Sequence, residues 1–414
     1  MPRTEGTLPV DIAEAVEGVR SGPTGPTVGV FFDFDDTIVH GSSTLSIEDG
    51  QSDTEIAESA RRHFAKKLAG FLYPEVWQLI RAHEAAGHTI VIASPVPQFR
   101  IAPVADALGI EHVLSTRPDT TATVREFAAE RNLDLPSSYG YSHSDRELLA
   151  VVGTGVAVNP VDARNRFVVF RERGRAKPRE VFRTAAGLAG FFGGVAAGGV
   201  EGLRVRDRRR SVDGMISHAG DFALKFAKID VAVTGAHNAE SPRPAVFIFN
   251  HQSELDLIVL AKVLRHGFTG ITKKELATSP LFGPLLRFAG ATFVDRSNTT
   301  KAKEALAPVV STLRGGLSVV IAPEGTRSLT PTLGPFKKGA FHIAIQAEVP
   351  IIPVVIRNAG ELYWKNAKTA RAGRVDVAVL DPIYVSNWTL DELDERVEQV
   401  RELFAQTLSH WPES

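Results

Sequence analysis

Short apolar runs alternate with longer amphipathic stretches along the first half of the chain. The runs are rich in β-branched and aromatic residues, as in strands buried on both faces of a parallel sheet, and lie at residues 28–32, 89–93 and 155–158. Apolar residues at helical spacing occupy 55–72, 75–86, 98–108 and 121–132. Strands that alternate with helices predict a doubly wound α/β domain over residues 25–180, after a loose polar leader at 1–24.

A second pattern of the same kind occupies residues 211–388. Its predicted strands lie at 246–250, 292–295, 318–323 and 351–356, with helical stretches between them. The chain closes at 389–414 with a predicted amphipathic helix over 390–408. Thr389, with Glu392 three residues later, has the sequence of a capping box, so we expect the helix to begin there.

Residues 181–210 separate the two predicted domains and differ from both in composition. The stretch 184–200 has no charged residue and is at the lower length limit for a bilayer span. Its helically spaced glycines predict close packing against another helix, and they are Gly187, Gly190, Gly194 and Gly198. Five arginines and one aspartate follow at 204–210. The segment is either a flexible linker or a membrane-dipping helix whose arginines meet anionic headgroups on the cytoplasmic side. Its phenylalanines favour the membrane.

Length, charge and cysteine content narrow the class of protein. At 414 residues the chain is long enough for two domains, and 43% apolar with 23% charged residues is typical of a globular protein. The formal net charge of −1 gives no overall field that would attract nucleic acid. The absence of cysteine excludes disulfides and thiolate metal sites.

His251 and Asp256 lie where the predicted strand 246–250 gives way to a helix. At such a corner the carboxylate can reach back to one ring nitrogen while the other nitrogen faces a cleft. An alcohol is a poor nucleophile, and an imidazole positioned to take its proton raises the rate by about 10²–10⁴. The carboxylate would fix the tautomer and stabilise the imidazolium. Acyl transfer to an alcohol needs such an arrangement. If the acyl donor is already a thioester, the reaction needs no Ser or Cys nucleophile.

The surrounding residues resemble the glycerol-3-phosphate and lysophosphatidic acid acyltransferase family. That family begins with an Asn-His block followed by Asp five positions after the His, as in Asn250, His251 and Asp256. Its later blocks follow here in the same order, at residues 274–283, 290–296, 323–328 and 349–354. Ordered blocks of this kind are a far more specific signal than one His and one Asp.

The resemblance also implies an acceptor site. Arg296 and Arg327 would bind the acceptor phosphate, because a guanidinium matches phosphate oxygens with two hydrogen bonds. Gly325 would let backbone amides approach the same anion. Glu324 would orient an arginine or the glycerol hydroxyls. The remaining positions that the resemblance places in the substrate site are Lys274 and Thr326.

A second constellation lies in the first half, where residues 30–37 place carboxylates at the end of a buried strand. This segment resembles the haloacid dehalogenase (HAD) superfamily, in its phosphoserine-phosphatase-like branch (subfamily IB), and Ser94 matches the family's second motif. The resemblance implies that Asp33 is a nucleophile that forms an aspartyl-phosphate and Asp35 a general acid/base. Mg²⁺ would be held by Asp33, Asp35 and Asp145.

Two motif positions depart from the HAD pattern. Residues 117–121 have no lysine, where family members carry one that neutralises phosphate charge. The usual pair of metal-binding acids four residues apart is reduced to Asp145, with Tyr141 at the other position. Loss of the lysine leaves the phosphoryl charge uncompensated. Loss of one acid weakens Mg²⁺ binding, since Mg²⁺ needs several hard oxygen ligands. These losses predict that the Rossmannoid HAD-like domain is kept as a scaffold; an active Mg²⁺-dependent phosphatase is the alternative. The short insert between the first two motifs predicts a reduced cap.

The two resemblances imply an α/β protein of two domains. They imply a 1-acyl-sn-glycerol-3-phosphate O-acyltransferase of phospholipid biosynthesis that moves an acyl group from acyl-CoA or acyl carrier protein to lysophosphatidate. We expect no cofactor for acyl transfer, no nucleic-acid partner, and a place at the cytoplasmic face of the membrane. The alternatives are a bifunctional enzyme whose HAD domain hydrolyses phosphomonoesters, and a membrane-docked pseudoenzyme that scaffolds lipid enzymes.

Overall fold

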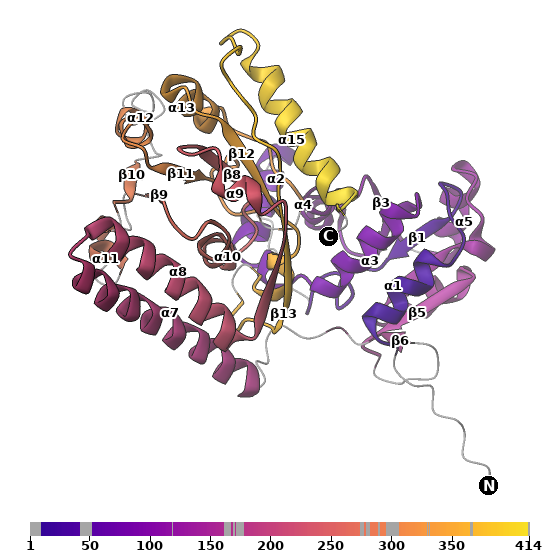
Figure 1. The fold of residues 1–414 in the computed structure, drawn as a ribbon. Helices are drawn as coiled ribbons and strands as arrows, with labels where there is room; N and C mark the ends of the chain where they lie inside the picture. Colours follow the sequence, from indigo (N-terminus) through magenta and orange to yellow (C-terminus); the bar gives the residue numbers. More distant parts are fainter. Residues whose placement is uncertain are drawn as a thin grey trace. The chain divides into compact units, whose positions relative to one another are not determined.

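The chain folds into two compact units (Figure 1). The structure is a computed structural model. It describes residues 10–41, 52–117, 119–160, 167–168, 170, 178–273, 277–278, 282–288, 290–294, 306–328, 330, 332–364 and 367–412. The first unit comprises Met1–Arg175 with Leu329–Thr332, and the second comprises Ala176–Ser328 with Leu333–Ser414.

The first unit is built on a parallel sheet of order β3-β2-β1-β4-β5-β6. Its strands are β1 (Gly29–Phe32), β2 (Thr89–Ser94), β3 (His112–Ser115), β4 (Tyr139–Ser142), β5 (Thr154–Val158) and β6 (Phe167–Val168). The predicted doubly wound α/β architecture is confirmed. The sequence pattern misses β4 because its residues, Tyr-Gly-Tyr-Ser, include a glycine and no β-branched side chain.

Helices lie between the strands of this unit. They are α1 (Ile12–Arg20), α2 (Asp53–Lys66), α3 (Pro74–Ala85), α4 (Gln98–Leu108), α5 (Thr120–Glu130) and α6 (Arg146–Val151), with 3₁₀ turns η1 (Leu68–Phe71) and η2 (Leu135–Ser137). The leader expected to be loose at 1–24 contains α1, which buries Val19 and packs on α3. A single apolar face is enough to dock such a short helix.

The second unit contains a mixed sheet of order β10-β9-β11-β8-β12-β13-β7, in which β13 runs antiparallel to β12. Its strands are β7 (Ile229–Thr234), β8 (Val246–Phe249), β9 (Phe268–Lys273), β10 (Thr292–Val294), β11 (Ser318–Ile321), β12 (Ile351–Ile356) and β13 (Gly373–Val379). Its helices are α7 (Pro178–Val205), α8 (Arg208–Ala227), α9 (His237–Glu240), α10 (Leu255–Leu264), α11 (Phe282–Phe288), α12 (Ala307–Arg314), α13 (Gly339–Ala347), α14 (Ala359–Leu362) and α15 (Leu393–Ser409).

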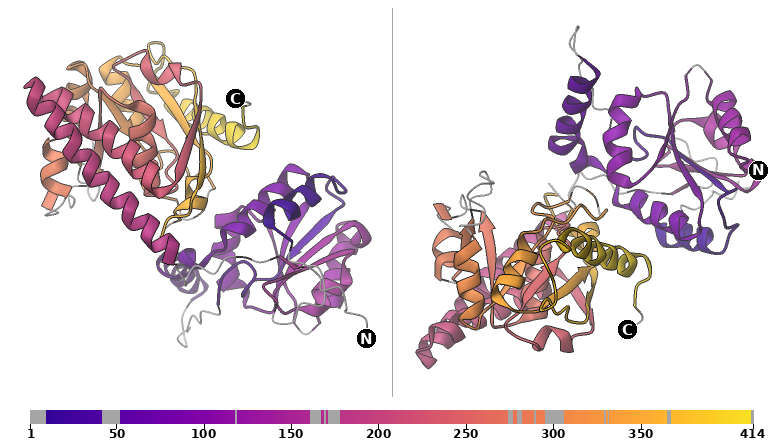
Figure 2. Two further views of the ribbon diagram at one scale, coloured as in Figure 1. Left: turned by 60° about the horizontal axis from the view of Figure 1, so that its bottom comes forward. Right: turned by 90° about the horizontal axis from the view of Figure 1, so that it is seen from above.

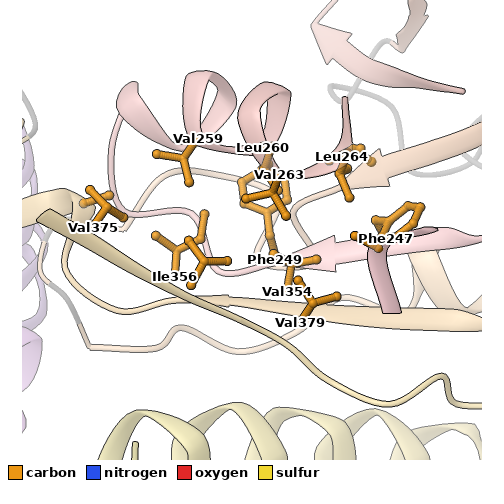
Figure 3. Packing of buried hydrophobic residues seen from close by; sticks show 14 of the residues in the cluster. Phe247, Phe249, Val259, Leu260, Val263, Leu264, Val354, Ile356, Val375 and Val379 are labelled. Carbon is orange, nitrogen blue, oxygen red and sulfur yellow. The ribbon is translucent and has the colours of Figure 1, made fainter. Parts of the chain in front are cut away.

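Strand β8 is the centre of this unit's core. Successive side chains point to opposite faces of a strand, so Phe247 and Phe249 enter the cluster that α10 covers, while Val246 and Ile248 enter the cluster beneath α13 and α15. Figure 3 shows the first cluster, where Phe249 lies close to Leu260. Burial on both faces explains why β8 is an unbroken apolar run. The packing of both faces also holds the end of the strand in position.

The glycine-rich segment belongs to α7, which lies alongside α8 in an antiparallel pair (Figures 1 and 2). The predicted close packing is confirmed, because the spaced glycines are buried against α8: Gly187, Gly190, Gly194, Gly198 and Gly202. Near its start, Arg183 donates to the carbonyl of Ala370 at 2.8 Å, and Thr184 Oγ1 accepts from the Ala370 amide at 2.9 Å. Since these bonds anchor the helix to the second unit, it is not a flexible linker.

The C-terminal helix begins later than the sequence predicts. Helix α15 starts at Leu393 with Glu392 at its N-cap position, and no side chain makes a capping hydrogen bond there. The capping box expected at Thr389 is therefore wrong. The apolar positions Leu393, Val397, Val400 and Phe404 are buried, so packing on the sheet decides where the helix begins.

A matched pair of glycine substitutions in α7 tests the helix pairing. A Cβ on Gly198 would lie 2.2 Å from the backbone of Gly214 and Met215, whereas a Cβ on Gly193 would meet no described atom within 4 Å. Alanine is favoured over glycine within a helix by about 1 kcal/mol, and overpacking costs about 1–3 kcal/mol. We expect Gly193→Ala to raise the thermal unfolding midpoint and Gly198→Ala to lower it. Equal shifts in the two variants would contradict the packing described here.

Candidate active sites

The end of β8 delivers a histidine to the carboxyl edge of the second sheet. Asn250 follows the strand and ties it to β12, because its side chain donates to the Ile356 carbonyl and accepts from the Ile356 amide, each at 2.8 Å. The sequence identifies Asn250 as part of a motif but not this role. His251 follows Asn250 directly. The two hydrogen bonds to β12 therefore fix the residue that precedes the histidine.

His251 and Asp256 come together as the sequence predicts. His251 Nδ1 lies 2.8 Å from Asp256 Oδ2, across the turn that joins β8 to α10. The side chain of Asp256 is 0% exposed and that of His251 is 23% exposed. A buried carboxylate therefore faces one ring nitrogen, while part of the ring remains accessible to a substrate. This geometry favours the tautomer that carries its proton on Nδ1 and leaves Nε2 able to accept a proton.

The backbone also helps to hold Asp256. Its Oδ2 accepts hydrogen bonds from the amides of Gln252 at 2.7 Å and Ser253 at 2.8 Å, so three donors converge on one oxygen. Burial raises the pKa of Asp256, and the hydrogen bond from His251 is the largest effect that opposes the rise. Among the residues described, Oδ1 has no hydrogen-bond partner. The carboxylate is thus oriented by the fold before any substrate arrives.

The loop after β11 lies beside this pair. Glu324 is buried and accepts hydrogen bonds from the amides of His251 at 2.8 Å and Gly334 at 3.0 Å. Burial raises the pKa of Glu324, and these two backbone bonds oppose the rise. Ser328 donates to the His251 carbonyl from both its amide and its hydroxyl. The sequence places Glu324 in the acceptor site, whereas the structure engages both of its oxygens with backbone amides.

The same loop carries the predicted phosphate-binding residues. Arg327 forms an ion pair with Glu254 and keeps 21% of its side chain exposed, and Thr326 is exposed. Gly325 has a φ of +75°, which L side chains rarely adopt, and the ammonium of Lys337 lies beside it. Arg296 and Lys274 lie outside the described residues, so their places in the substrate site remain predictions.

The first unit holds a second cluster at the carboxyl end of β1. Asp33 is buried, and it accepts hydrogen bonds from the Phe34 amide at 2.7 Å, from Ser94 Oγ at 3.0 Å and from Ser142 Oγ at 2.8 Å. Asp35 lies 3.7 Å from Arg100. Burial raises the pKa of both aspartates. The structure therefore brings Asp33 and Ser94 together as predicted, and Ser142 joins them without having been foreseen.

Tyr141, at the position of the missing acid, turns into the core. Its ring stacks on Phe32 with centroids 4.7 Å apart, and its hydroxyl lies 3.0 Å from His83 Nε2. His83 Nδ1 in turn lies 2.8 Å from His88 Nδ1, and His88 Nε2 lies 2.8 Å from the carbonyl of Pro23. If the Tyr141 hydroxyl donates to His83, two neutral imidazoles can make all three hydrogen bonds in this series. Burial lowers the pKa of His83 to about 3, which keeps it neutral.

Asp145, which the HAD resemblance assigns to Mg²⁺, has protein partners in the structure. Asp145 caps α6 by accepting from the Leu148 amide at 2.9 Å and also accepts from Thr120 Oγ1 at 3.0 Å. Within the described ranges, no group of three His, Cys, Asp or Glu side chains could hold a metal ion. The Mg²⁺ site at Asp33, Asp35 and Asp145 stays a prediction, with Asp145 engaged in capping α6 and Tyr141 supplying no acid.

Two different protein-family models match the two halves of the chain. The acyltransferase family model matches residues 230–357, and the haloacid dehalogenase-like hydrolase model matches residues 49–150, after Asp33 and Asp35.

Three acyltransferases are similar to part of this chain. The human 1-acyl-sn-glycerol-3-phosphate acyltransferase alpha is 37% identical over 42% of this chain and 62% of its own length, so this chain spans less than two thirds of that relative. The 1-acyl-sn-glycerol-3-phosphate acyltransferase of Limnanthes douglasii is 31% identical over 46% of this chain and 67% of its own. A crystal structure of the 1-acyl-sn-glycerophosphate (LPA) acyltransferase PlsC from Thermotoga maritima is 26% identical and covers 57% of this chain and 98% of that one, with a TM-score of 0.48.

Motif order, fold and similarity agree for the second unit, whose matched region contains the His251–Asp256 pair. The first unit has the parallel sheet and the family match of a HAD-like domain. The chain belongs to the acyltransferase family and carries a haloacid dehalogenase-like domain ahead of its acyltransferase domain.

Proposed function

We propose that the second unit is a 1-acyl-sn-glycerol-3-phosphate O-acyltransferase that uses His251 as a general base. The observation that carries the proposal is the 2.8 Å contact between His251 Nδ1 and the buried Asp256, which leaves Nε2 for the substrate. The names of the relatives supply the reaction class, and the acyl donor would be acyl-CoA or acyl carrier protein.

In the proposed reaction the acceptor hydroxyl gives its proton to His251 Nε2 as its oxygen attacks the thioester carbonyl. The tetrahedral intermediate then collapses, the carbon–sulfur bond breaks, and the leaving thiolate takes the proton back from Nε2. Asp256 stabilises the imidazolium between these two steps. Because the donor is a thioester, the step needs no covalent acyl-enzyme.

We further propose that arginines bind the acceptor phosphate beside this base. Arg327 supports this assignment because it lies on the loop that touches the His251 backbone, and part of its side chain remains exposed. Its partner Glu254 leaves further guanidinium donors for a phosphate. Arg296 and Lys274 are assigned to the same pocket by family resemblance alone.

We propose that the α7–α8 pair rests on the cytoplasmic face of a membrane as a shallow insertion. Helix α7 is long and apolar enough to cross a bilayer by length and composition, which by itself is weak support. The exposed large apolar residues of the pair are Val181, Phe182, Leu188, Val200, Leu203, Val205, Phe222 and Phe226.

The basic run contributes less to lipid contact than its composition suggests. Arg208 donates to the Phe288 carbonyl at 2.8 Å, and Arg209 donates to the Phe268 carbonyl at 3.0 Å. Arg204 and Arg206 are exposed and would face anionic headgroups.

We propose that the HAD-like domain is degenerate and has no phosphatase activity. Two observations support this: the Tyr141 hydroxyl is bonded to His83, and the oxygens of Asp145 are taken by a cap and by Thr120. A divalent cation would find too few acidic oxygens there.

Substitution of the base tests the proposed reaction. We expect His251→Ala to lower kcat by about 10²–10⁴ because one positioned general base is lost. Asp256→Asn should also lower kcat, since an amide cannot enforce the same tautomer. Acyl transfer from acyl-CoA to lysophosphatidate is measured by product mass. Unchanged turnover in His251→Ala would refute the mechanism.

Removal of exposed apolar side chains tests membrane contact. Each large apolar side chain that leaves water contributes on the order of 1.5–3 kcal/mol. The double variant Phe182→Ser/Leu203→Ser should therefore bind phosphatidylcholine/phosphatidylglycerol vesicles at least about tenfold more weakly in cosedimentation. Leu390→Ser, at an exposed apolar position on the C-terminal segment, is the control and should bind as the wild type does. Equal binding by all three proteins would exclude these helices as the contact.

The HAD-like domain is tested with the full chain and a panel of phosphomonoesters in Mg²⁺. We expect no phosphate release above that of Asp33→Asn, and equal acyl transfer by the two proteins. Release that requires both Asp33 and Mg²⁺ would instead establish the bifunctional alternative.

A further inference from the structure

The main chain of His251 is held on both sides by the loop that follows β11. Its N–H donates to Glu324 Oε1 at 2.8 Å. Its carbonyl accepts from the Ser328 amide at 2.8 Å and from Ser328 Oγ at 3.0 Å. Two residues four positions apart thus hold the peptide groups on either side of the histidine Cα.

Glu324 makes a second connection at the same time. Its side chain is buried, and Oε2 accepts from the Gly334 amide at 3.0 Å, so one carboxylate joins two backbone segments. A carboxylate suits this place because it has two acceptor oxygens and no donor. Each oxygen already accepts one backbone hydrogen bond, and at 6% exposure the buried side chain presents little surface to glycerol hydroxyls or an arginine.

We propose that Glu324 is a positioning residue for His251 that acts through the histidine backbone and makes no contact with the acceptor. This role rests on the proposed acyl transfer. It assigns Glu324 differently from the family resemblance, which places the residue in the acceptor site.

Two separate constraints are needed to aim the imidazole. Asp256 sets the rotation of the ring through Nδ1, but it does not fix the Cα from which the ring extends. Glu324 and Ser328 fix that Cα from either side. A base must lie within hydrogen-bond reach of the hydroxyl, and a misplacement of about 1 Å can cost about 10²-fold in rate.

The chemistry of the side chain predicts which substitutions fail. Glutamine keeps the size of Glu324 but presents an amide donor to one of the two N–H groups, so one bond is lost. Aspartate keeps the charge but is one methylene shorter, so it cannot reach both amides. A change from glutamate to either residue should therefore move His251 without removing any group that would touch the acceptor.

Steady-state kinetics of the full chain, with acyl-CoA and lysophosphatidate, separate the two assignments. For Glu324→Gln we expect kcat to fall by about 10–100-fold with the KM for lysophosphatidate within about twofold of wild type. Glu348→Gln, an exposed glutamate in the same unit, is the matched control and should change neither constant. A rise in KM of tenfold or more with unchanged kcat would overturn the proposal and restore the acceptor-binding role.

Hydrogen exchange gives a readout that does not depend on activity. In Glu324→Gln, peptides that contain residues 249–253 should exchange faster than in wild type, while peptides from the first unit remain unchanged. If the wild-type protein shows no acyl transfer, the proposed function is refuted. The exchange result would still decide whether Glu324 holds the His251 backbone. Exchange at 249–253 equal to that of wild type would overturn it.

Discussion

The hydrogen bond between His251 and Asp256 is the interaction on which the rest of the acyltransferase unit depends. It joins a fully buried carboxylate to a partly accessible ring. Burial makes the desolvation of the carboxylate costly, so the carboxylate needs hydrogen-bond donors in fixed positions. The cost is met by three donors on one carboxylate oxygen. Such a group can be kept in place only by a rigid frame, and strand β8 provides that frame because it is buried on both faces.

The frame extends from the core to the site without interruption. Phe247 and Phe249 fix the position of β8 against α10, and Asn250 bonds the strand's end to β12. Glu324 and Ser328 then hold the residue that follows. The His251 ring is therefore the last member of a series of constraints that begins in the hydrophobic core.

The HAD-like unit has the same general architecture with different chemistry at its strand ends. Asp33 and Ser94 survive and hydrogen-bond to each other, so the motif remains recognisable. Tyr141, however, has been drawn into a buried chain of hydrogen bonds with His83 and His88. A side chain committed to the core in this way stabilises the fold and is lost to a metal site.

The sequence by itself determined the two α/β patterns, the glycine stripe of α7, and the pairing of His251 with Asp256. Each is readable because a local rule applies: strand and helix periods differ, glycine permits close approach, and five residues span one strand-to-helix corner. Strand β4, which has no β-branched residue, could not be predicted from the sequence because its neighbouring strands stabilise it.

Only the tertiary structure decided the roles of Glu324, Ser328, Tyr141 and Asp145. Apart from the Asp145 cap on Leu148, their partners lie between 10 residues away, for Glu324–Gly334, and 77 residues away, for Ser328–His251, and no sequence period encodes such contacts. Glutamate in a phosphate-site motif looks like a ligand until both its oxygens are found on backbone amides. Burial and competing hydrogen bonds, which depend on the whole fold, determine what each of these side chains can do.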